Sequence, residues 1–235
     1  MAVSLLLLAG VAQAQPAAPP AKPAPVSKFL SPGELDPATL LPPPPKDDML
    51  AAVEGRAELH RLAAVRSPER LAQARHDDAV EEVTAITEIF GPAFSLERFP
   101  ATARLFADLR NEDSVAAKQA KAFFKRERPF AADRALDVCD DAHDVRNSYP
   151  SGHATMGYAA AAVLANLMPG NAQIILARAA DYAESRLYCG VHYRADVDAS
   201  QVLANVMVVK LMAKPEFRAE LDAARAELTA AHIAP

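Results

Sequence analysis

The 235-residue sequence has no tryptophan, few other aromatic residues and only eight glycines. It also has almost no strand-like alternation of apolar and polar residues, which argues against a β-sheet architecture. Hydrophobic residues make up 51% of the chain, most of them alanine and leucine, and this mixture favours helices. The length suits one domain with a sizeable core. We therefore expect a single all-α domain.

An excess of positive charge is also missing. Lysine and arginine total 25 residues against 30 aspartates and glutamates, so the net charge is −5. This balance gives no general attraction to nucleic acid polymers or to anionic lipid, and any anion site must be local. The uncharged stretch over residues 154–177 is split by Pro169-Gly170 and rich in alanine, so a packed pair of helices explains it better than a membrane span.

The N-terminal region divides into two parts. An apolar run over residues 3–12 and a small-x-small pattern at residues 12–14 predict a signal peptide over residues 1–14, and hence export to the periplasm. No lysine or arginine precedes this run, and an uncleaved anchor is the alternative. Residues 15–46 form a Pro/Ala-rich extended arm that ends in four prolines. The helical domain occupies residues 47–235.

Apolar residues within residues 47–235 recur at helical spacing. Two stretches are interpreted as core stripes without chemistry: Leu50, Val53, Ala57 and Leu62, then Val80, Val83, Ile86 and Phe90. Further helices are predicted over residues 101–109, 113–127, 151–168, 171–188, 196–212 and 215–231. Residues 130–149 have weak periodicity and many aspartates, so a long loop is expected there.

The first cluster of polar residues is Lys121 and Arg128, with Pro129 directly after them. On a helix, seven residues are close to two turns, so both cations would project from nearly the same face and could hold one anion. The alternative is a solvated basic face, which is supported by the neighbouring Lys118, Lys125 and Arg126.

The second cluster is Pro150-Ser151-Gly152-His153, at the start of an alanine-rich helical pattern. Ser151 can cap the helix, and Gly152 allows close approach of the backbone to a ligand. Because a helix N-terminus offers free N–H groups and a positive dipole end, His153 would lie beside an anion site. An ordinary loop-to-helix junction with a surface histidine is the alternative.

The third cluster is Ser185-Arg186, followed by His192 and then Asp196. If the chain is helical near His192, the spacing of four residues brings the Asp196 carboxylate to its ring. A carboxylate on one ring nitrogen fixes the tautomer and leaves the other nitrogen free as a base or nucleophile. Arg186 adds a planar fork of donors that suits phosphate oxygens.

Together the clusters read Lys-x6-Arg-Pro, Pro-Ser-Gly-His and Ser-Arg-x5-His-x3-Asp. This arrangement resembles the tripartite signature of the type 2 phosphatidic acid phosphatase superfamily, which also contains the vanadium haloperoxidases. More narrowly, the chain is similar to the class A bacterial non-specific acid phosphatases at Ser148-Tyr149 and Cys189-Gly190. It departs from that class at Asn147 and Ala154, where glycine and threonine are common, although no residue of the signature is lost.

The resemblance implies a role for each residue of the signature. His192 would be the nucleophile and form a phosphohistidine, Asp196 would orient it, and His153 would act as general acid and then as base. The phosphate oxygens would be held by Lys121, Arg128, Ser151, Gly152 and Arg186. With these cations around the phosphoryl group, no metal and no other cofactor is expected.

The implied activity is that of a metal-independent acid phosphatase acting on a broad range of small phosphate monoesters, with phosphotransfer to alcohols as a side activity. A homodimer or higher homo-oligomer is expected, without nucleic acid or membrane as partner. Two alternatives stay open: a vanadium-dependent haloperoxidase-like enzyme and a non-catalytic phosphate-binding helical domain.

Cys139 and Cys189 are the only cysteines. In an exported protein an even pair indicates a disulfide, which would tie the loop before His153 to the end of the helix that carries Arg186.

Overall fold

The computed structural model describes residues 26–31, 33–80, 83–139 and 144–233, and within these ranges every regular element is a helix. The all-α prediction is therefore confirmed, whereas the signal peptide predicted over residues 1–14 lies outside the described residues. The helices are α1 (Pro37–Leu40), α2 (Leu50–Val65), α3 (Pro68–Ala79), α4 (Thr84–Thr87), α5 (Pro100–Phe124), α6 (Pro129–Ala132), α7 (Gly152–Leu167), α8 (Ala172–Tyr188), α9 (Arg194–Ala213) and α10 (Pro215–Ala230), with 3₁₀ turns at Glu88–Ala93, Leu96–Arg98 and Pro169–Asn171.

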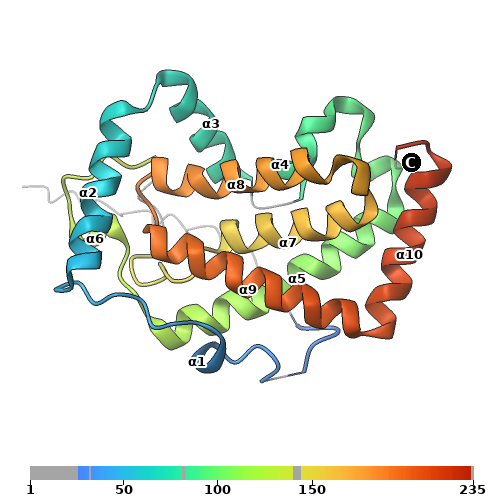
Figure 1. The fold of residues 1–235 in the computed structure, drawn as a ribbon, viewed down its shortest axis with the longest axis horizontal. Helices are drawn as coiled ribbons and strands as arrows, with labels where there is room; N and C mark the ends of the chain where they lie inside the picture. The colour runs from blue at the N-terminus through green and yellow to red at the C-terminus, as the bar shows by residue number, and fades with distance from the viewer. Residues whose placement is uncertain (1–25, 32, 81–82, 140–143, 234–235) are drawn as a thin grey trace, which may run out of the picture.

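Helix α7 forms the centre of the domain and packs against α8, α9 and α5 (Figure 1). Alanines along α7, such as Ala159, Ala160 and Ala161, are fully buried, and their small side chains let the neighbouring helices approach closely. Gly157 shows the same requirement, because a Cβ at this position would lie 2.6 Å from Cδ1 of Tyr182 on α8. The N-terminal half of α7 is thereby fixed against α8, and this half carries His153.

The helices after residue 150 begin and end within two residues of their predicted bounds. Upstream, the two helices predicted over residues 101–109 and 113–127 are one helix, α5, because no glycine or proline interrupts residues 101–124. Helix α5 ends at Phe124, earlier than predicted, since Lys125 adopts the left-handed conformation (φ 48°) and turns the chain away from the helix axis.

Helix α2 does not bury all of the residues that were predicted to form its core face. Leu50 and Val53 are 71% and 48% exposed, so their interpretation as core residues was wrong. The face of α2 that is buried instead contains Ala52 and Leu59, because α2 lies at one end of the molecule and contacts α8 along only part of its length (Figure 1). The second predicted stripe fits the structure better, since Val83 and Ile86 are buried.

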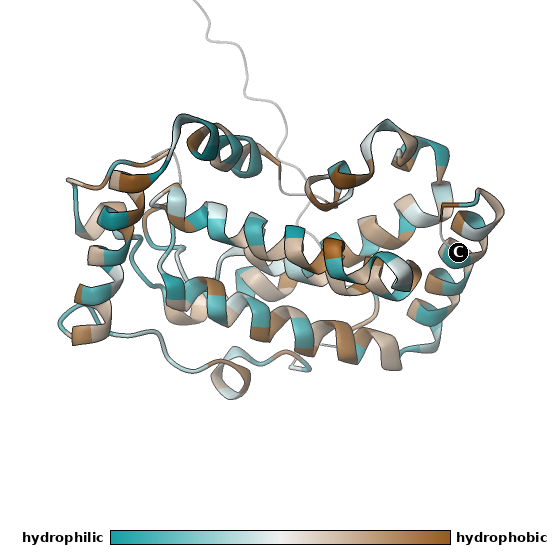
Figure 2. Cartoon of the chain, turned by 45° about the horizontal axis from the view of Figure 1, so that its top comes forward, coloured by the Kyte–Doolittle hydropathy of each residue, from teal (hydrophilic) through white to brown (hydrophobic). Residues whose placement is uncertain are grey.

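The described part of the arm, residues 26–46 without residue 32, lies along the surface of the helical domain. Leu30, Leu35 and Leu41 of the arm are buried. Glu112 of α5 holds the arm in place, because its carboxylate accepts hydrogen bonds from the backbone N–H groups of Lys28 and Phe29. Colouring by hydropathy shows both apolar and polar residues along the helices, as expected for helices that bury one face and expose the opposite face to solvent (Figure 2).

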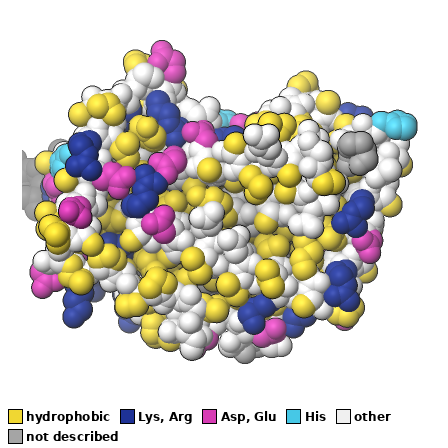
Figure 3. Space-filling model, in the orientation of Figure 1, with side chains coloured by type: hydrophobic (Ala, Val, Ile, Leu, Met, Phe, Trp, Pro, Cys, Tyr) yellow, Lys and Arg dark blue, Asp and Glu magenta, His cyan; other side chains and the backbone are white. Residues whose placement is uncertain are grey.

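None of the described helices is long and apolar enough to cross a membrane. On the face that includes α8 and α9, apolar side chains are interspersed with polar ones, and charged side chains gather toward the end near α2 (Figure 3).

Candidate active site

Three segments that are distant in the sequence meet around His192. They are the turn from α5 into α6, the start of α7, and the connection from α8 to α9. Arg128 of the first segment contacts His192, and the backbone N–H of Ser151 at the start of α7 donates to Ser200 Oγ of α9 at 2.9 Å. The fold thus brings the three predicted clusters into one place.

His192 is buried, with only 1% of its surface exposed. Its Nδ1 lies 3.3 Å from Oδ2 of Asp196, and its Nε2 lies 3.0 Å from Nη1 of Arg128. A guanidinium only donates hydrogen bonds and a carboxylate only accepts them. Nδ1 therefore carries the proton, and the lone pair of Nε2 is directed toward Arg128.

Asp196 reaches His192 in a way that differs from the predicted helical spacing. Helix α9 begins at Arg194, so His192 precedes it, and Asp196 lies in the first turn of the helix. The Asp196 carboxylate accepts the N–H of Tyr193 at 2.9 Å, which caps the helix and aims Oδ2 back at the histidine ring. Asp196 is fully buried.

Arg128 and Lys121 approach the site from different elements, which corrects the prediction that both lie on one helix. Lys121 is half-buried in the last turn of α5, whereas Arg128 lies beyond the turn at Lys125 and directly precedes α6. The Arg128 guanidinium also donates to the carbonyls of Asp144 (3.0 Å) and Val191 (2.9 Å). These bonds fix its position beside His192.

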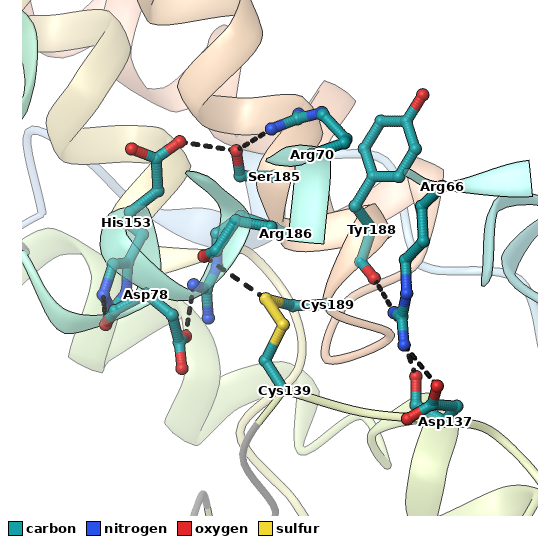
Figure 4. Close-up of a disulfide and its surroundings, with 12 residues drawn as sticks. Arg66, Arg70, Asp78, Asp137, Cys139, His153, Ser185, Arg186, Tyr188 and Cys189 are labelled. Atoms are coloured by element: carbon teal, nitrogen blue, oxygen red, sulfur yellow. Dashed lines mark hydrogen bonds and ion pairs between the residues drawn. A yellow bond between two sulfur atoms is a disulfide. The ribbon is translucent and has the colours of Figure 1, made fainter. Parts of the chain in front are cut away.

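Arg186 is fully buried near the end of α8. Its Nη1 forms an ion pair with the carboxylate of Asp78 (Figure 4). Asp78 lies in the last turn of α3, directly after the buried Asp77. Its Nε and Nη2 are buried and have no hydrogen-bond partner among the described residues. Because buried donors without a partner are unfavourable, these two nitrogens are suited to an anion that would enter the site.

The start of α7 has the predicted form. Ser151 precedes the helix, and its Oγ accepts the N–H of Ala154 at 3.3 Å, while Gly152 and His153 occupy the first turn. His153 Nε2 lies 3.0 Å from the backbone carbonyl of Asp78 (Figure 4). Asp78 therefore contacts both His153 and Arg186, through two different groups.

The charges at the site act on the protonation of His192. Burial lowers the pKa of His192 well below its usual value, and the cations Arg128, Arg186 and Lys121 lower it further. The ring is therefore neutral in mildly acidic solution. Burial and the charge of Arg186 lower the pKa of Arg128 to about 10, so Arg128 remains a cation there.

Two residues at the site did not stand out in the sequence. Arg126 was grouped with a solvated basic face, but it is buried and its Nη1 donates to Oδ1 of Asp196 at 2.7 Å. Asp78 lies in a charged stretch of α3 and is 108 residues from Arg186 in the sequence, so no sequence pattern predicts that the two residues form a pair. Only the packing of α3 against α8 brings these two residues together.

The predicted disulfide between Cys139 and Cys189 is confirmed, with Cα atoms 4.7 Å apart (Figure 4). The backbone N–H of Cys139 also donates to the carbonyl of Cys189 at 3.1 Å. Since Cys189 is three residues before His192, the bridge fixes the segment that leads into the site.

Replacing both cysteines by alanine is expected to destabilise the fold by up to about 4 kcal/mol, because the bridge closes a 50-residue separation and restricts the unfolded chain. Urea unfolding of the Cys139→Ala/Cys189→Ala variant and of wild type measures the difference. Alkylation of unreduced wild type, followed by mass determination, is the control, and two free thiols would contradict the bridge.

Among the described residues there is no group of three or more histidine, cysteine, aspartate or glutamate side chains that could hold a metal ion. The site instead presents guanidinium, ammonium and imidazole groups, with backbone N–H groups at the start of α7. This donor set matches a tetrahedral oxyanion.

Comparison with known proteins agrees with this chemistry. The PAP2 superfamily matches residues 112–218. The chain is 32% identical over 201 residues to a non-specific acid phosphatase of Providencia stuartii, covering 82% of this chain and 81% of that protein. It is also 32% identical over 212 residues to a non-specific acid phosphatase of Salmonella typhimurium, covering 86% and 84%. The crystal structure of Aquifex aeolicus LpxE, at 20% identity, covers 71% of this chain and 98% of that chain with a TM-score of 0.52, a likeness of fold alone.

Proposed function

Because this chain belongs to the PAP2 superfamily and is similar over most of its length to bacterial non-specific acid phosphatases, we propose that it hydrolyses a broad range of small phosphate monoesters through a phosphohistidine formed on His192. The class of enzyme is that of a phosphoric monoester hydrolase. One observation carries the proposed mechanism: His192 lies between the Asp196 carboxylate at Nδ1 and the Arg128 guanidinium at Nε2. This arrangement favours the Nδ1–H tautomer, in which Nε2 is an unprotonated nucleophile.

In the proposed reaction, Nε2 of His192 attacks phosphorus while the ester P–O bond breaks. His153 gives its proton to the departing alkoxide, and then takes a proton from the water that cleaves the P–N bond. Orthophosphate leaves, and His192 returns to its neutral form. An alcohol that reaches the phosphohistidine in place of water would accept the phosphoryl group, which is the proposed transferase side activity.

The proposed cradle for the phosphoryl oxygens consists of Lys121, Arg128, Arg186, the Ser151 hydroxyl and the Gly152 N–H. The unpartnered Nε and Nη2 of Arg186 support it. Fixed donors of this kind stabilise charge that develops in the transition state and need no reorganisation during the reaction. Chemistry of this type requires no metal ion at the site.

Hydrolysis of p-nitrophenyl phosphate in excess EDTA, with and without orthovanadate, tests this function. We expect chelator-resistant activity that is highest at mildly acidic pH, because His153 must begin protonated while the lowered pKa of His192 keeps the nucleophile neutral there. Orthovanadate should inhibit, since it adopts the geometry of the transition state. Folded protein that is inactive, or active only with an added divalent metal, would contradict the proposal, and peroxide-dependent bromide oxidation with vanadate would favour the haloperoxidase alternative.

We also propose export to the periplasm, with a signal peptide at residues 1–14 and a catalytic domain at residues 47–235. The Cys139–Cys189 disulfide supports this location, because such bridges persist in oxidising compartments. Assembly as a homodimer or higher homo-oligomer stays a prediction.

A further inference from the structure

Arg126 is a buried cation that the proposed mechanism does not use. Its side chain is only 5% exposed, although the residues on both sides of it, Lys125 and Glu127, are exposed. The left-handed backbone of Lys125 ends α5 and turns the next residue inward. A buried arginine needs a partner for its charge, and Arg126 finds one in Asp196, at 2.7 Å from Nη1 to Oδ1.

The contacts of Arg126 place it on the side of Asp196 away from the His192 ring. Asp196 Oδ1 accepts from Arg126, whereas Oδ2 faces the histidine and also accepts the Ser148 hydroxyl at 2.6 Å. The carbonyl of Arg126 accepts the N–H of the same serine at 3.1 Å, and its guanidinium lies 4.1 Å from the ring centroid of Tyr193. The Arg126 side chain is thus held by an ion pair and a ring contact, and its backbone by a hydrogen bond.

We propose that Arg126 is a positioning residue, which keeps Asp196 as a fixed carboxylate and thereby keeps the proton of His192 on Nδ1, so that the lone pair of Nε2 stays available to attack phosphorus. This inference rests on the proposed function, since it concerns the nucleophile of that reaction. Arg126 does not contact the reacting atoms and acts only through Asp196.

The charges around Asp196 explain why a cation is needed there. Burial raises the pKa of Asp196, and Arg126 opposes this effect most strongly, followed by the hydrogen bonds from Ser148 and Tyr193. Among the described residues, the other titratable groups that interact with Asp196 are His192, Arg128 from the turn before α6, and Tyr149 from the loop before α7. Arg128 is committed to the opposite side of His192 through its contact with Nε2.

A protonated Asp196 would disable the nucleophile. Its hydroxyl would donate to Nδ1 of His192, so the ring proton would move to Nε2. Nε2 would then be a donor facing Arg128, which is itself only a donor, and no lone pair would point at the phosphoryl group.

Arg126→Met tests the inference, because methionine keeps a similar length of apolar stem and removes the charge. We expect kcat/KM for p-nitrophenyl phosphate to fall about 10- to 100-fold at pH 6, as for other groups that orient a functional histidine. The acidic limb of the pH profile should move to higher pH, since Asp196 without its cation holds its proton more tightly, and raising the pH should restore part of the activity. Arg126→Lys, which keeps the charge, should keep the limb near its wild-type position.

Arg146→Met is the matched control. Arg146 is exposed on the loop before α7 and lies near Arg126, but among the described residues it makes no hydrogen bond or ion pair with Asp196, so the variant removes the same charge from the same region. It should leave the pH profile unchanged. Thermal unfolding of each variant establishes that it is folded at the assay temperature.

A double-mutant cycle and a spectroscopic readout separate positioning from a general structural effect. If Arg126 acts through Asp196, adding Arg126→Met to Asp196→Asn should change kcat/KM by less than about 2-fold. Nitrogen-15 NMR of the imidazoles, with His192 assigned by its loss in His192→Ala, should show the Nδ1–H tautomer in wild type and a shift away from it in Arg126→Met.

The two proposals fail in different ways. An Arg126→Met variant with the wild-type pH profile and tautomer overturns the role of Arg126, while hydrolysis in EDTA by wild type leaves the proposed function intact. A wild-type protein without phosphatase activity overturns the proposed function. The NMR measurement does not depend on activity, so even in that case an unchanged His192 tautomer in Arg126→Met would overturn the role of Arg126.

Discussion

Replacing His192 by alanine is expected to lower kcat for phosphate monoesters by at least about 10⁴-fold. The variant removes the atom that the proposed reaction joins to phosphorus, and the surrounding cations can bind phosphate but cannot replace a nucleophile. The measurement is steady-state hydrolysis of p-nitrophenyl phosphate at pH 6 in EDTA. Residual activity within about 10-fold of wild type would show that another group or a direct attack by water performs the reaction.

A trapping experiment makes this prediction specific to the nucleophile. Rapid quenching of wild type with phosphorus-32-labelled substrate should leave label on the protein that is labile in acid and stable in base, as expected for a phosphoramidate. His192→Ala should carry none. His60→Ala is the matched control, because His60 is an exposed histidine of α2 paired with Asp133 at 2.9 Å, outside the site, and it should hydrolyse and trap label like wild type.

The residues that the sequence placed around a phosphate do meet in the structure, although not always by the predicted route. Lys121 and Arg128 were expected on one helical face, yet the left-handed turn at Lys125 separates them, and they converge from different elements. His192 and Asp196 were expected one helical turn apart, yet a cap at the start of α9 joins them. The sequence separation within each pair is therefore compatible with the site, although neither pair lies on one continuous helix as predicted.

The supporting residues could not be predicted in this way. Arg126 stands in a basic stretch that looks like a solvated surface, and its burial depends on one backbone conformation at Lys125. Asp78 meets Arg186 only because α3 packs against α8, a contact between segments about a hundred residues apart. Sequence patterns report local structure well, whereas the pairing of buried charges is a property of tertiary packing.

Replacing Arg186 by alanine is expected to lower kcat/KM by about 10²- to 10³-fold, the usual cost of removing one fixed donor from a developing oxyanion. The reason lies in the two buried nitrogens of Arg186, Nε and Nη2, that no described protein group satisfies. Arg186→Lys is the matched control, because it keeps a charge and loses the planar fork, and it should recover only part of the activity. Activity within about 5-fold of wild type in Arg186→Ala would remove Arg186 from the proposed cradle.

Arg186→Ala also leaves the carboxylate of Asp78 without its partner, so a loss of activity could come from damage to the fold. Adding Asp78→Asn removes the uncompensated charge, and we expect it to restore thermal stability without restoring hydrolysis.

Phosphate binding supplies a readout apart from turnover, because a ligand at 100 times its Kd stabilises the native state by about 2.7 kcal/mol. Orthophosphate should therefore raise the melting temperature of wild type and of His192→Ala, which keeps the proposed cradle, and should raise it much less in Arg186→Ala/Asp78→Asn. Equal shifts in all three proteins would mean that phosphate is held elsewhere, and that the unpartnered nitrogens of Arg186 serve the fold.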